Sequence, residues 1–221
     1  MNVFNIIYEY KDAFISGLLV TFKLAIISWV CGLFFGFIIG MLGAKLKKGI
    51  GLPLKITSFF LSGIPILVLL FWLNYPLQAI LNITINPFIT ACVALSIINI
   101  FSVAEIIKNA LNEFPEQYIL AGRVNGISSK RIFYFIKFPI IIRQVLPSLL
   151  FLQVTILQST LFASLISVNE IFRVAQQINS ILYKPIEIYS ALAIFFLLIC
   201  LPLNGFALWI KTKYTRNISE K

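Results

Sequence analysis

Residues that could perform acid–base or metal chemistry are scarce in this chain. It has no histidine, and its three cysteines lie singly inside apolar segments, without metal-ligand spacing or a pairing pattern. The apolar segments contain no central Asp or Glu. This composition excludes most general acid–base and metal-assisted catalysis. We therefore expect no catalytic residue, no metal site and no cofactor held by the chain itself.

Solute binding is also possible for this chain, because amide and hydroxyl side chains interrupt its apolar segments. Polar groups inside a membrane often line the path of a solute. They can equally form hydrogen bonds between helices, each contributing about 1 kcal/mol or less. For any single residue the structural role is favoured, and both roles remain open. The candidate pathway residues are Asn99, Gln153, Gln158, Ser159 and Thr160.

The composition shows which elements must position these side chains. The chain has 221 residues, of which 60% are hydrophobic and 12% charged. A soluble domain carries about 25% charged residues, so lipid is the natural solvent of this chain. The net charge of +10 could suggest nucleic acid as a partner, but the basic residues lie between apolar runs and therefore indicate membrane topology. We expect one transmembrane domain, residues 1–221, and an all-α membrane protein.

Five segments are long enough to cross the bilayer, which takes about 20 apolar residues. A charge-free run of 49 residues, Ile56–Ala104, is too long for one crossing. Asn and Pro cluster in its middle, which predicts a turn there. In the first segment Gly32, Gly36 and Gly40 fall on one helix face, which indicates either close helix packing or ordinary tolerance of glycine. The predicted crossings are about 13–42, 57–73, 88–107, 145–167 and 188–210.

Lysine and arginine accumulate in cytoplasmic loops, and 14 of the 18 basic residues lie in segments 43–55, 108–144 and the tail after 210. The opposite side holds only Lys11, Arg173 and Lys184, and Lys23 lies within the first crossing. We therefore expect the N-terminus outside and the C-terminus in the cytoplasm.

The long segment 108–144, between the third and fourth crossings, is both basic and apolar. Pro115 can open a helix, Gly126 can close it, and Ser128 or Ser129 can cap the next one. Pro139 is expected to break the pattern before the fourth crossing. The segment is therefore predicted to form two short helices at the membrane surface, joined by a turn at Gly126. They could rest on anionic lipid or dock a cytoplasmic partner.

Several motifs, in a specific order and spacing, resemble the permease subunits of bacterial ATP-binding-cassette importers, and more narrowly the polar amino-acid permeases. The segment around Gly126 resembles that family's Glu-Ala-Ala…Gly…Ile-x-Leu-Pro loop, although Leu120 stands at the acidic position and Gly122 at the second alanine. The chain departs from the family at other positions too. Gln158-Ser159 stands where the family often has a Lys-Asp pair in the fourth crossing, and Ser62 and Ile64 stand where it has an Arg and a Thr before the proline that corresponds to Pro65. The motifs that carry the resemblance are Gly17–Thr21, Ser62–Val68, Ala104–Ile106, Leu120–Pro139, Gln144–Pro147 and Ile166–Glu170.

The resemblance implies an ATP-driven importer of an amino acid or similar small polar solute in the bacterial cytoplasmic (inner) membrane. Its partners would be two copies of a cytoplasmic ATPase, a second permease subunit, identical or different, and an extracytoplasmic solute-binding protein. The chain has no Gly-x-x-x-x-Gly-Lys-Ser/Thr loop to cradle nucleotide phosphates, so the partner would bind ATP and Mg²⁺. The residues implied in coupling to the ATPase are Leu120, Ala121, Gly122, Arg123, Gly126 and Pro139.

Other functions remain as alternatives. An importer permease for another solute, such as methionine or an opine-like compound, would share the same motifs. An ion-driven secondary transporter typically shows internal repeats and buried acids, and neither is visible here. A membrane scaffold without transport activity would not bind an ATPase. The sequence alone does not specify the solute.

Overall fold

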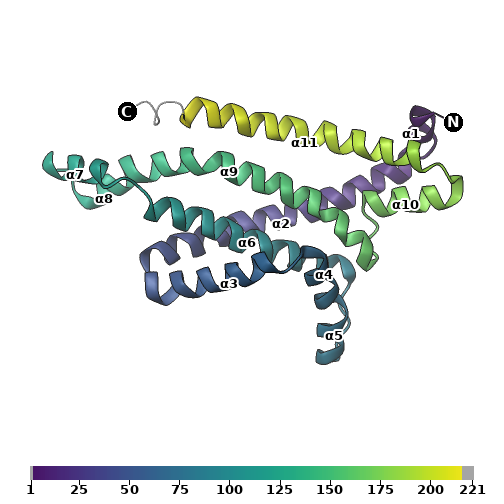
Figure 1. The fold of residues 1–221 in the computed structure, drawn as a ribbon, viewed down its shortest axis with the longest axis horizontal. Coiled ribbons are helices and arrows are strands. Elements are labelled where there is room, and N and C mark those ends of the chain that lie inside the picture. Colours follow the sequence, from purple (N-terminus) through teal and green to yellow (C-terminus); the bar gives the residue numbers. More distant parts are fainter. Residues whose placement is uncertain (1, 216–221) are drawn as a thin grey trace.

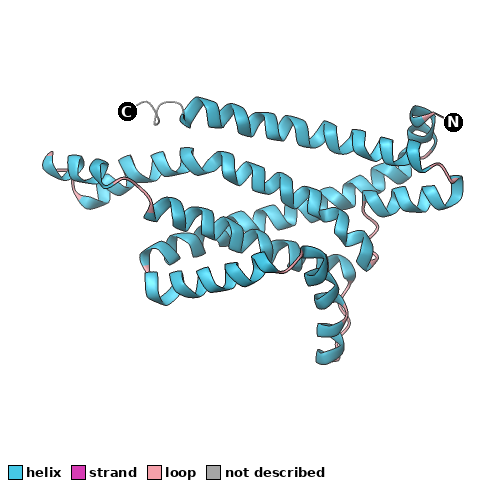
Figure 2. Ribbon diagram, in the orientation of Figure 1, coloured by secondary structure: helices cyan, strands magenta, loops and turns pink. Residues whose placement is uncertain are grey.

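Helices and their connecting turns make up residues 2–215, which the computed structural model of the chain describes, and no strand occurs among them (Figure 2). The prediction of an all-α protein is confirmed. In chain order, the elements are α1 (Val3–Glu9), α2 (Lys11–Lys45), the π-helix η1 (Lys47–Gly51), α3 (Leu52–Gly63), α4 (Ile66–Asn74), α5 (Pro76–Leu81), α6 (Pro87–Asn112), α7 (Glu116–Val124), α8 (Ser129–Arg131), the π-helix η2 (Ile132–Lys137), α9 (Phe138–Ser159), the 3₁₀ helix η3 (Thr160–Ile166), α10 (Ile171–Leu182) and α11 (Pro185–Thr215).

Four of the described helices are long and apolar enough to cross a membrane. They are α2, α6, the continuous helix Ser129–Ile166 that comprises α8, η2, α9 and η3, and α11. Two further segments, Lys47–Gly63 and Ile66–Leu81, pass the same test together and are bent by 96°. The predicted number of about five crossings is therefore matched when this bent pair counts as one.

The second crossing is not the single helix over 57–73 that we predicted. Helix α3 ends at Gly63, Ile64 is extended with φ −97° and ψ 119°, and α4 begins after Pro65. A proline disfavours helical geometry in the residue before it and cannot donate a backbone hydrogen bond. The predicted turn beyond α4 is present, with Asn82 in the left-handed region and the Asn86 side chain accepting a hydrogen bond from the Phe88 N–H at 2.9 Å.

The prediction that Pro139 breaks the chain before the fourth crossing is wrong. The helix begins at Ser129, well before residue 145, and continues through Pro139 to Ile166. Immediately before the proline, η2 shifts the hydrogen bonds by one residue, and the Phe138 N–H reaches the Phe133 carbonyl. A proline lacks the N–H of a regular turn, and the wider π-helical turn changes the bonding pattern where that donor is missing. The segment therefore holds one separate short helix, α7, and not two.

The glycines of α2 mark its closest contact, which is with α6. A Cβ at Gly36 would lie 2.7 Å from the Ile100 carbonyl oxygen, and one at Gly40 would lie 2.7 Å from the Ala104 carbonyl oxygen. A Cβ at Gly32 would overlap the Asn99 amide. Only glycine permits this approach of two helices. Of the two interpretations of the glycine spacing, close packing is confirmed.

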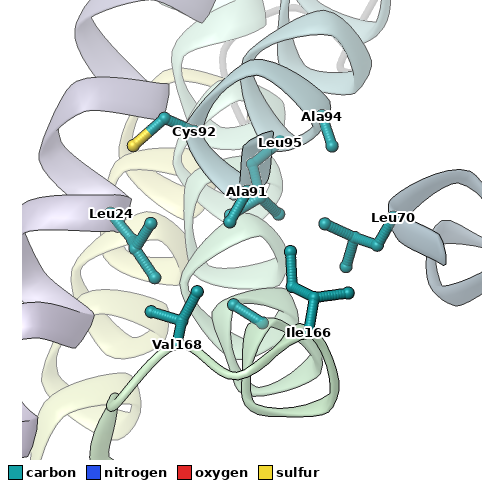
Figure 3. Packing of buried hydrophobic residues seen from close by; sticks show 9 residues of the cluster. Leu24, Leu70, Ala91, Cys92, Ala94, Leu95, Ile166 and Val168 are labelled. Atoms are coloured by element: carbon teal, nitrogen blue, oxygen red, sulfur yellow. The ribbon is translucent and has the colours of Figure 1, made fainter. Parts of the chain in front are cut away.

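The basic segments gather at one end of the bundle (Figure 1). Helix α7, η1 and the last turns of α11 lie there, whereas α1 and α10 lie at the other end. A buried cluster at the crossing of α2, α4, α6 and η3 holds the bundle together (Figure 3). In it Leu24, Leu70 and Ile166 are at most 1% exposed. The segments predicted to share one side of the membrane therefore do share one end of the molecule.

Candidate functional site: an exposed helix and two polar regions

Helix α7 has the local geometry that the sequence predicts. Pro115 precedes it in an extended conformation, and Gly126 follows it with φ +72°. The Gly126 N–H donates to the Arg123 carbonyl at 2.9 Å, and the Ile127 N–H donates to the Gly122 carbonyl at 3.0 Å. These bonds close the helix end in the pattern that requires a left-handed residue. The chain thus leaves α7 at a fixed angle before the long helix begins at Ser129.

The faces of α7 differ in what they contact. Gly122 is its buried residue, and a Cβ there would lie 2.9 Å from Ile132 of η2. Leu120 is 55% exposed and Val124 is 88% exposed, one helical turn apart on the same face. Ala121 and Arg123 are exposed as well. Gly122 is therefore small because η2 packs against it, and the exposed face of α7 carries unpartnered apolar side chains.

The base of α7 is fixed to the bundle. Phe114 and Ile119 belong to a buried cluster with Leu111 of α6 and with Ile141 and Val145 of α9. Displacement of α7 must therefore displace the ends of two membrane-crossing helices. Pro139, which we grouped with the α7 residues, lies inside the long helix and not at a joint.

Two of the five candidate pathway residues bond to each other. The Asn99 Nδ2 donates to Gln153 Oε1 at 2.8 Å and to the Ser28 carbonyl at 2.9 Å, and the Gln153 Nε2 donates to Asn99 Oδ1 at 3.2 Å. The Trp29 indole N–H donates to the Gln153 carbonyl at 2.9 Å. Both amides are buried and satisfied. They join α2, α6 and α9 by hydrogen bonds between helices, which is the structural one of the two roles that the sequence left open.

The other three candidates point in different directions. The Thr160 hydroxyl is fully buried and donates to the Leu157 carbonyl at 2.7 Å. The Ser159 hydroxyl donates to the Thr155 carbonyl at 2.8 Å. Gln158 is exposed and lies beside the Cys200 thiol of α11. The structure therefore does not gather the polar cluster of the fourth crossing into one site.

A groove between α3 and α6 was not predicted from the sequence. It encloses about 380 Å³, and the apolar residues Phe59, Leu61, Ile98 and Phe101 line it together with Lys55, Ser58, Ser62, Ser102 and Glu105. The Ser58 hydroxyl is buried without a hydrogen-bond partner. Ser58 and Ser62 are four residues apart and therefore share a helix face. This spacing is the feature of the sequence that could have indicated the groove.

Another unanticipated feature is the N-terminal cap of α10. The fully buried Glu170 carboxylate accepts hydrogen bonds from the Phe172 and Arg173 N–H groups at 2.9 and 2.8 Å. Burial raises the pKa of this carboxyl to about 7, although the two N–H groups and the Arg173 guanidinium oppose the shift. An acidic residue before an apolar helix is a known cap signal.

Comparison with known proteins agrees with this architecture. The chain is 27% identical to the histidine/lysine/arginine/ornithine transport system permease protein HisQ of Escherichia coli, over 97% of this chain and 98% of that protein. It is 30% identical to the L-cystine transport system permease protein TcyB of Bacillus subtilis, over 86% and 81% of the two chains. A solved structure described as an amino acid ABC transporter with histidines superposes with a TM-score of 0.85 at 23% identity, covering 96% of this chain and 99% of that one.

Residues 6–216, nearly the whole chain, match the family described as binding-protein-dependent transport system inner membrane component. The match assigns the helical bundle to the membrane component of a transport system, and it argues against an ion-driven secondary transporter and a scaffold. The chain therefore belongs to this family and is a multi-pass inner-membrane permease subunit of an ATP-binding-cassette importer.

Proposed function

We propose that this permease carries an amino acid into the cell. The match to the importer family over residues 6–216 carries the proposal. Support for the solute class comes from the relatives, which are described as permeases for histidine, lysine, arginine and ornithine and for L-cystine. The groove between α3 and α6 presents the Lys55 ammonium, together with the Glu105 carboxylate, which is paired with Lys108 at 2.6 Å.

The chain works, in this proposal, with its N-terminus outside and its C-terminus in the cytoplasm. The gathering of the basic segments at the α7 end of the bundle supports this orientation (Figure 1). A second permease subunit, identical or different, completes the pathway. The exposed apolar side chains of α4 and α5, including Trp72 and Ile80, offer a surface for it. An extracytoplasmic solute-binding protein delivers the solute at the α10 end.

Helix α7 docks against a cytoplasmic ATPase, of which two copies bind ATP and Mg²⁺. Its exposed Leu120 and Val124 form an apolar ridge that has no partner within the described chain. Leu120 occupies the position where the corresponding loop of the polar amino-acid permeases has an acidic residue, so the proposed contact with the ATPase is apolar rather than charged. Because the base of α7 packs on α6 and α9, closure of the ATPases would tilt these helices and change access to the pathway.

The solute path follows the groove between α3 and α6 rather than the buried amide pair. Ser58 has an unused hydroxyl there, whereas Asn99 and Gln153 already satisfy each other. Gln158 stays a candidate because its amide is exposed. Ser102→Leu should then reduce uptake in an assembled transporter, and Gln153→Leu should instead lower its thermal stability.

The decisive experiment is uptake by the purified complex in proteoliposomes. The permease, its ATPase and its binding protein are reconstituted with enclosed ATP and supplied with labelled histidine, arginine, glutamine, cystine, methionine or an opine. Uptake of one or more amino acids that requires ATP supports the proposal. Uptake driven by an ion gradient without ATP would refute it, and uptake of the opine alone would refute the solute class.

A mutant pair tests the role of α7. Val124→Arg should prevent copurification of the ATPase, because a charge would replace the most exposed apolar side chain of the ridge. Ser180→Arg on α10 is the matched control, since it is exposed at the opposite end of the bundle. If the ATPase copurifies equally with both variants, α7 is not the docking helix.

A further inference from the structure

A basic cavity opens beside α7 at the lysine-rich end of the bundle. It encloses about 500 Å³ between the ends of α2 and α6, the base of α7, and η2. Lys45, Lys47 and Lys137 line it from three separate segments, and Glu116 is the one carboxylate in the lining. The cavity therefore concentrates positive charge at the level where the crossings end.

This charge is not neutralised within the described chain. None of the three lysines makes a salt bridge to a described residue. The Lys137 ammonium lies 5.4 Å from the centre of the Phe114 ring, which holds it toward the cavity, and it lies close enough to Lys47 for the two charges to repel. An anion placed between them would remove this repulsion.

The neighbouring cavity provides a contrast. It encloses about 590 Å³ and has Lys47, Lys55 and Lys108 in its lining, but Glu105 and Glu113 line it as well. Lys108 is paired with Glu105 at 2.6 Å. Its charges are therefore nearly balanced, whereas the cavity beside α7 carries an excess of two positive charges.

The walls of the basic cavity are apolar. Met41, Leu111, Ile119 and Phe133 line it beside the lysines. An apolar crevice of only about 10 Å³ adjoins it and shares Met41 and Leu111, and its other lining residues are Phe37, Ile107, Phe138, Ile141 and Ile142. The crevice lies between α2, α6 and α9, on the membrane side. A matching ligand therefore needs an anionic head and an apolar body.

We propose that this cavity binds the phosphate headgroup of an anionic phospholipid from the cytoplasmic leaflet. Basic pockets between crossing helices on that side are suited to such headgroups. The three lysines would hold the phosphate, and the acyl chains would begin at the apolar side chains Met41, Leu111 and Phe133 that line the cavity. A free phosphate ion would use the lysines but not the apolar walls. The assignment to the cytoplasmic leaflet rests on the orientation proposed above.

The bound lipid would touch the element that we propose docks the ATPase. Phe114, Glu116 and Ile119 line the cavity and form the base of α7. An occupied cavity would brace α7 against the bundle, and an empty one would leave three ammonium groups repelling one another. The lipid would thus adjust how firmly the ATPase is coupled to the crossings.

The test uses the assembled transporter with its ATPase, stripped of lipid in detergent and titrated with phosphatidylglycerol under native mass spectrometry. The triple variant Lys45→Gln, Lys47→Gln, Lys137→Gln removes the site. The control, Lys48→Gln, Lys130→Gln, Arg131→Gln, removes equal charge from the same end of the molecule at residues that do not line the cavity. Each lysine near an anionic lipid contributes about 1 kcal/mol, roughly a fivefold change, so the triple variant should bind up to about 100-fold more weakly.

Three results would overturn the proposal. Equal weakening in the two variants would mean that the binding follows net charge and has no defined site. Full displacement of the lipid by inorganic phosphate would identify a site for a free anion. Loss of the ATPase from the triple variant with unchanged lipid binding would identify a protein contact. Failure of the ATPase to join even the wild-type chain would refute the proposed coupling, and lipid binding by the permease alone would still be measured.

Discussion

Two short helices outside the crossings, α7 and α10, lie at opposite ends of the bundle and differ in what covers them. Helix α10 buries Ile171, Ala175 and Ile178 against α2 and α11, and the Glu170 carboxylate caps it. Helix α7 has no side-chain cap and exposes Leu120 and Val124. The apolar face of α10 is covered within the chain, whereas that of α7 is uncovered among the described residues. Apolar content alone therefore does not distinguish a helix that packs within the chain from one that stays exposed.

The largest expected effect is a loss of packing in α10. Ile178→Ala should lower the free energy of unfolding by about 2–5 kcal/mol, because Ile178 is 3% exposed within a cluster. Val124→Ala, the matched truncation in α7, should change it by less than about 0.5 kcal/mol. Thermal unfolding in detergent measures both. Equal destabilisation by the two variants would abolish the distinction between the helices.

The packing of α7 against η2 gives the next largest effect on stability. Gly122→Leu should destabilise the protein by about 1–3 kcal/mol and weaken copurification of the ATPase, because its side chain would overlap Ile132. Ala121→Leu adds comparable bulk at the neighbouring exposed position and should leave stability unchanged. If Gly122→Leu unfolds at the wild-type temperature, Gly122 does not pack against Ile132 in the way described here.

The turn after α7 should give a smaller effect, and its control should change stability in the opposite direction. Gly126→Ala places a side chain at φ +72° and should cost about 1–2 kcal/mol. Gly205→Ala, within α11 and in open space, should instead stabilise by up to about 1 kcal/mol through helix propensity. Chemical denaturation of the two variants compares them, and a stabilising Gly126→Ala would contradict the left-handed turn.

A further effect concerns pH and belongs to α10. The pKa of Glu170 is raised from 4.5 to about 7, so the folded protein holds a proton that the unfolded chain releases. Stability from this group is fully present below pH 4.5 and declines as the pH rises to about 7. Glu170→Gln keeps an amide oxygen for the cap and removes the titration. The melting temperature of the wild type relative to this variant should therefore fall as the pH rises from about 4.5 to about 7 in a titration series.

The sequence could predict features that depend on neighbouring residues. Pro115 and Gly126 bound a short helix because their backbone preferences act within one turn. The membrane crossings could be predicted from the sequence, because the length of an apolar segment depends only on consecutive residues. The glycine spacing of α2 indicated a packing face, although only the structure identifies α6 as the partner.

Other features depend on how the helices are rotated against one another. Asn99 and Gln153 could be assigned to two crossings, but their facing amides follow from the rotation of α6 and α9. The sequence does not show that the helix continues through Pro139, because this continuation depends on the π-helical turn before the proline, which no local rule anticipates. The groove between α3 and α6 depends on the break at Pro65, which lies hidden inside a charge-free run.

That break has a consequence for biogenesis. Helix α3 has 12 residues and α4 has nine, so at about 1.5 Å per residue they extend only about 18 and 14 Å. The hydrocarbon core is about 30 Å thick. Standing alone in the membrane, each helix would leave free backbone ends facing lipid. Both helices pack against α6, so we expect the third crossing to stabilise the second when the chain is inserted.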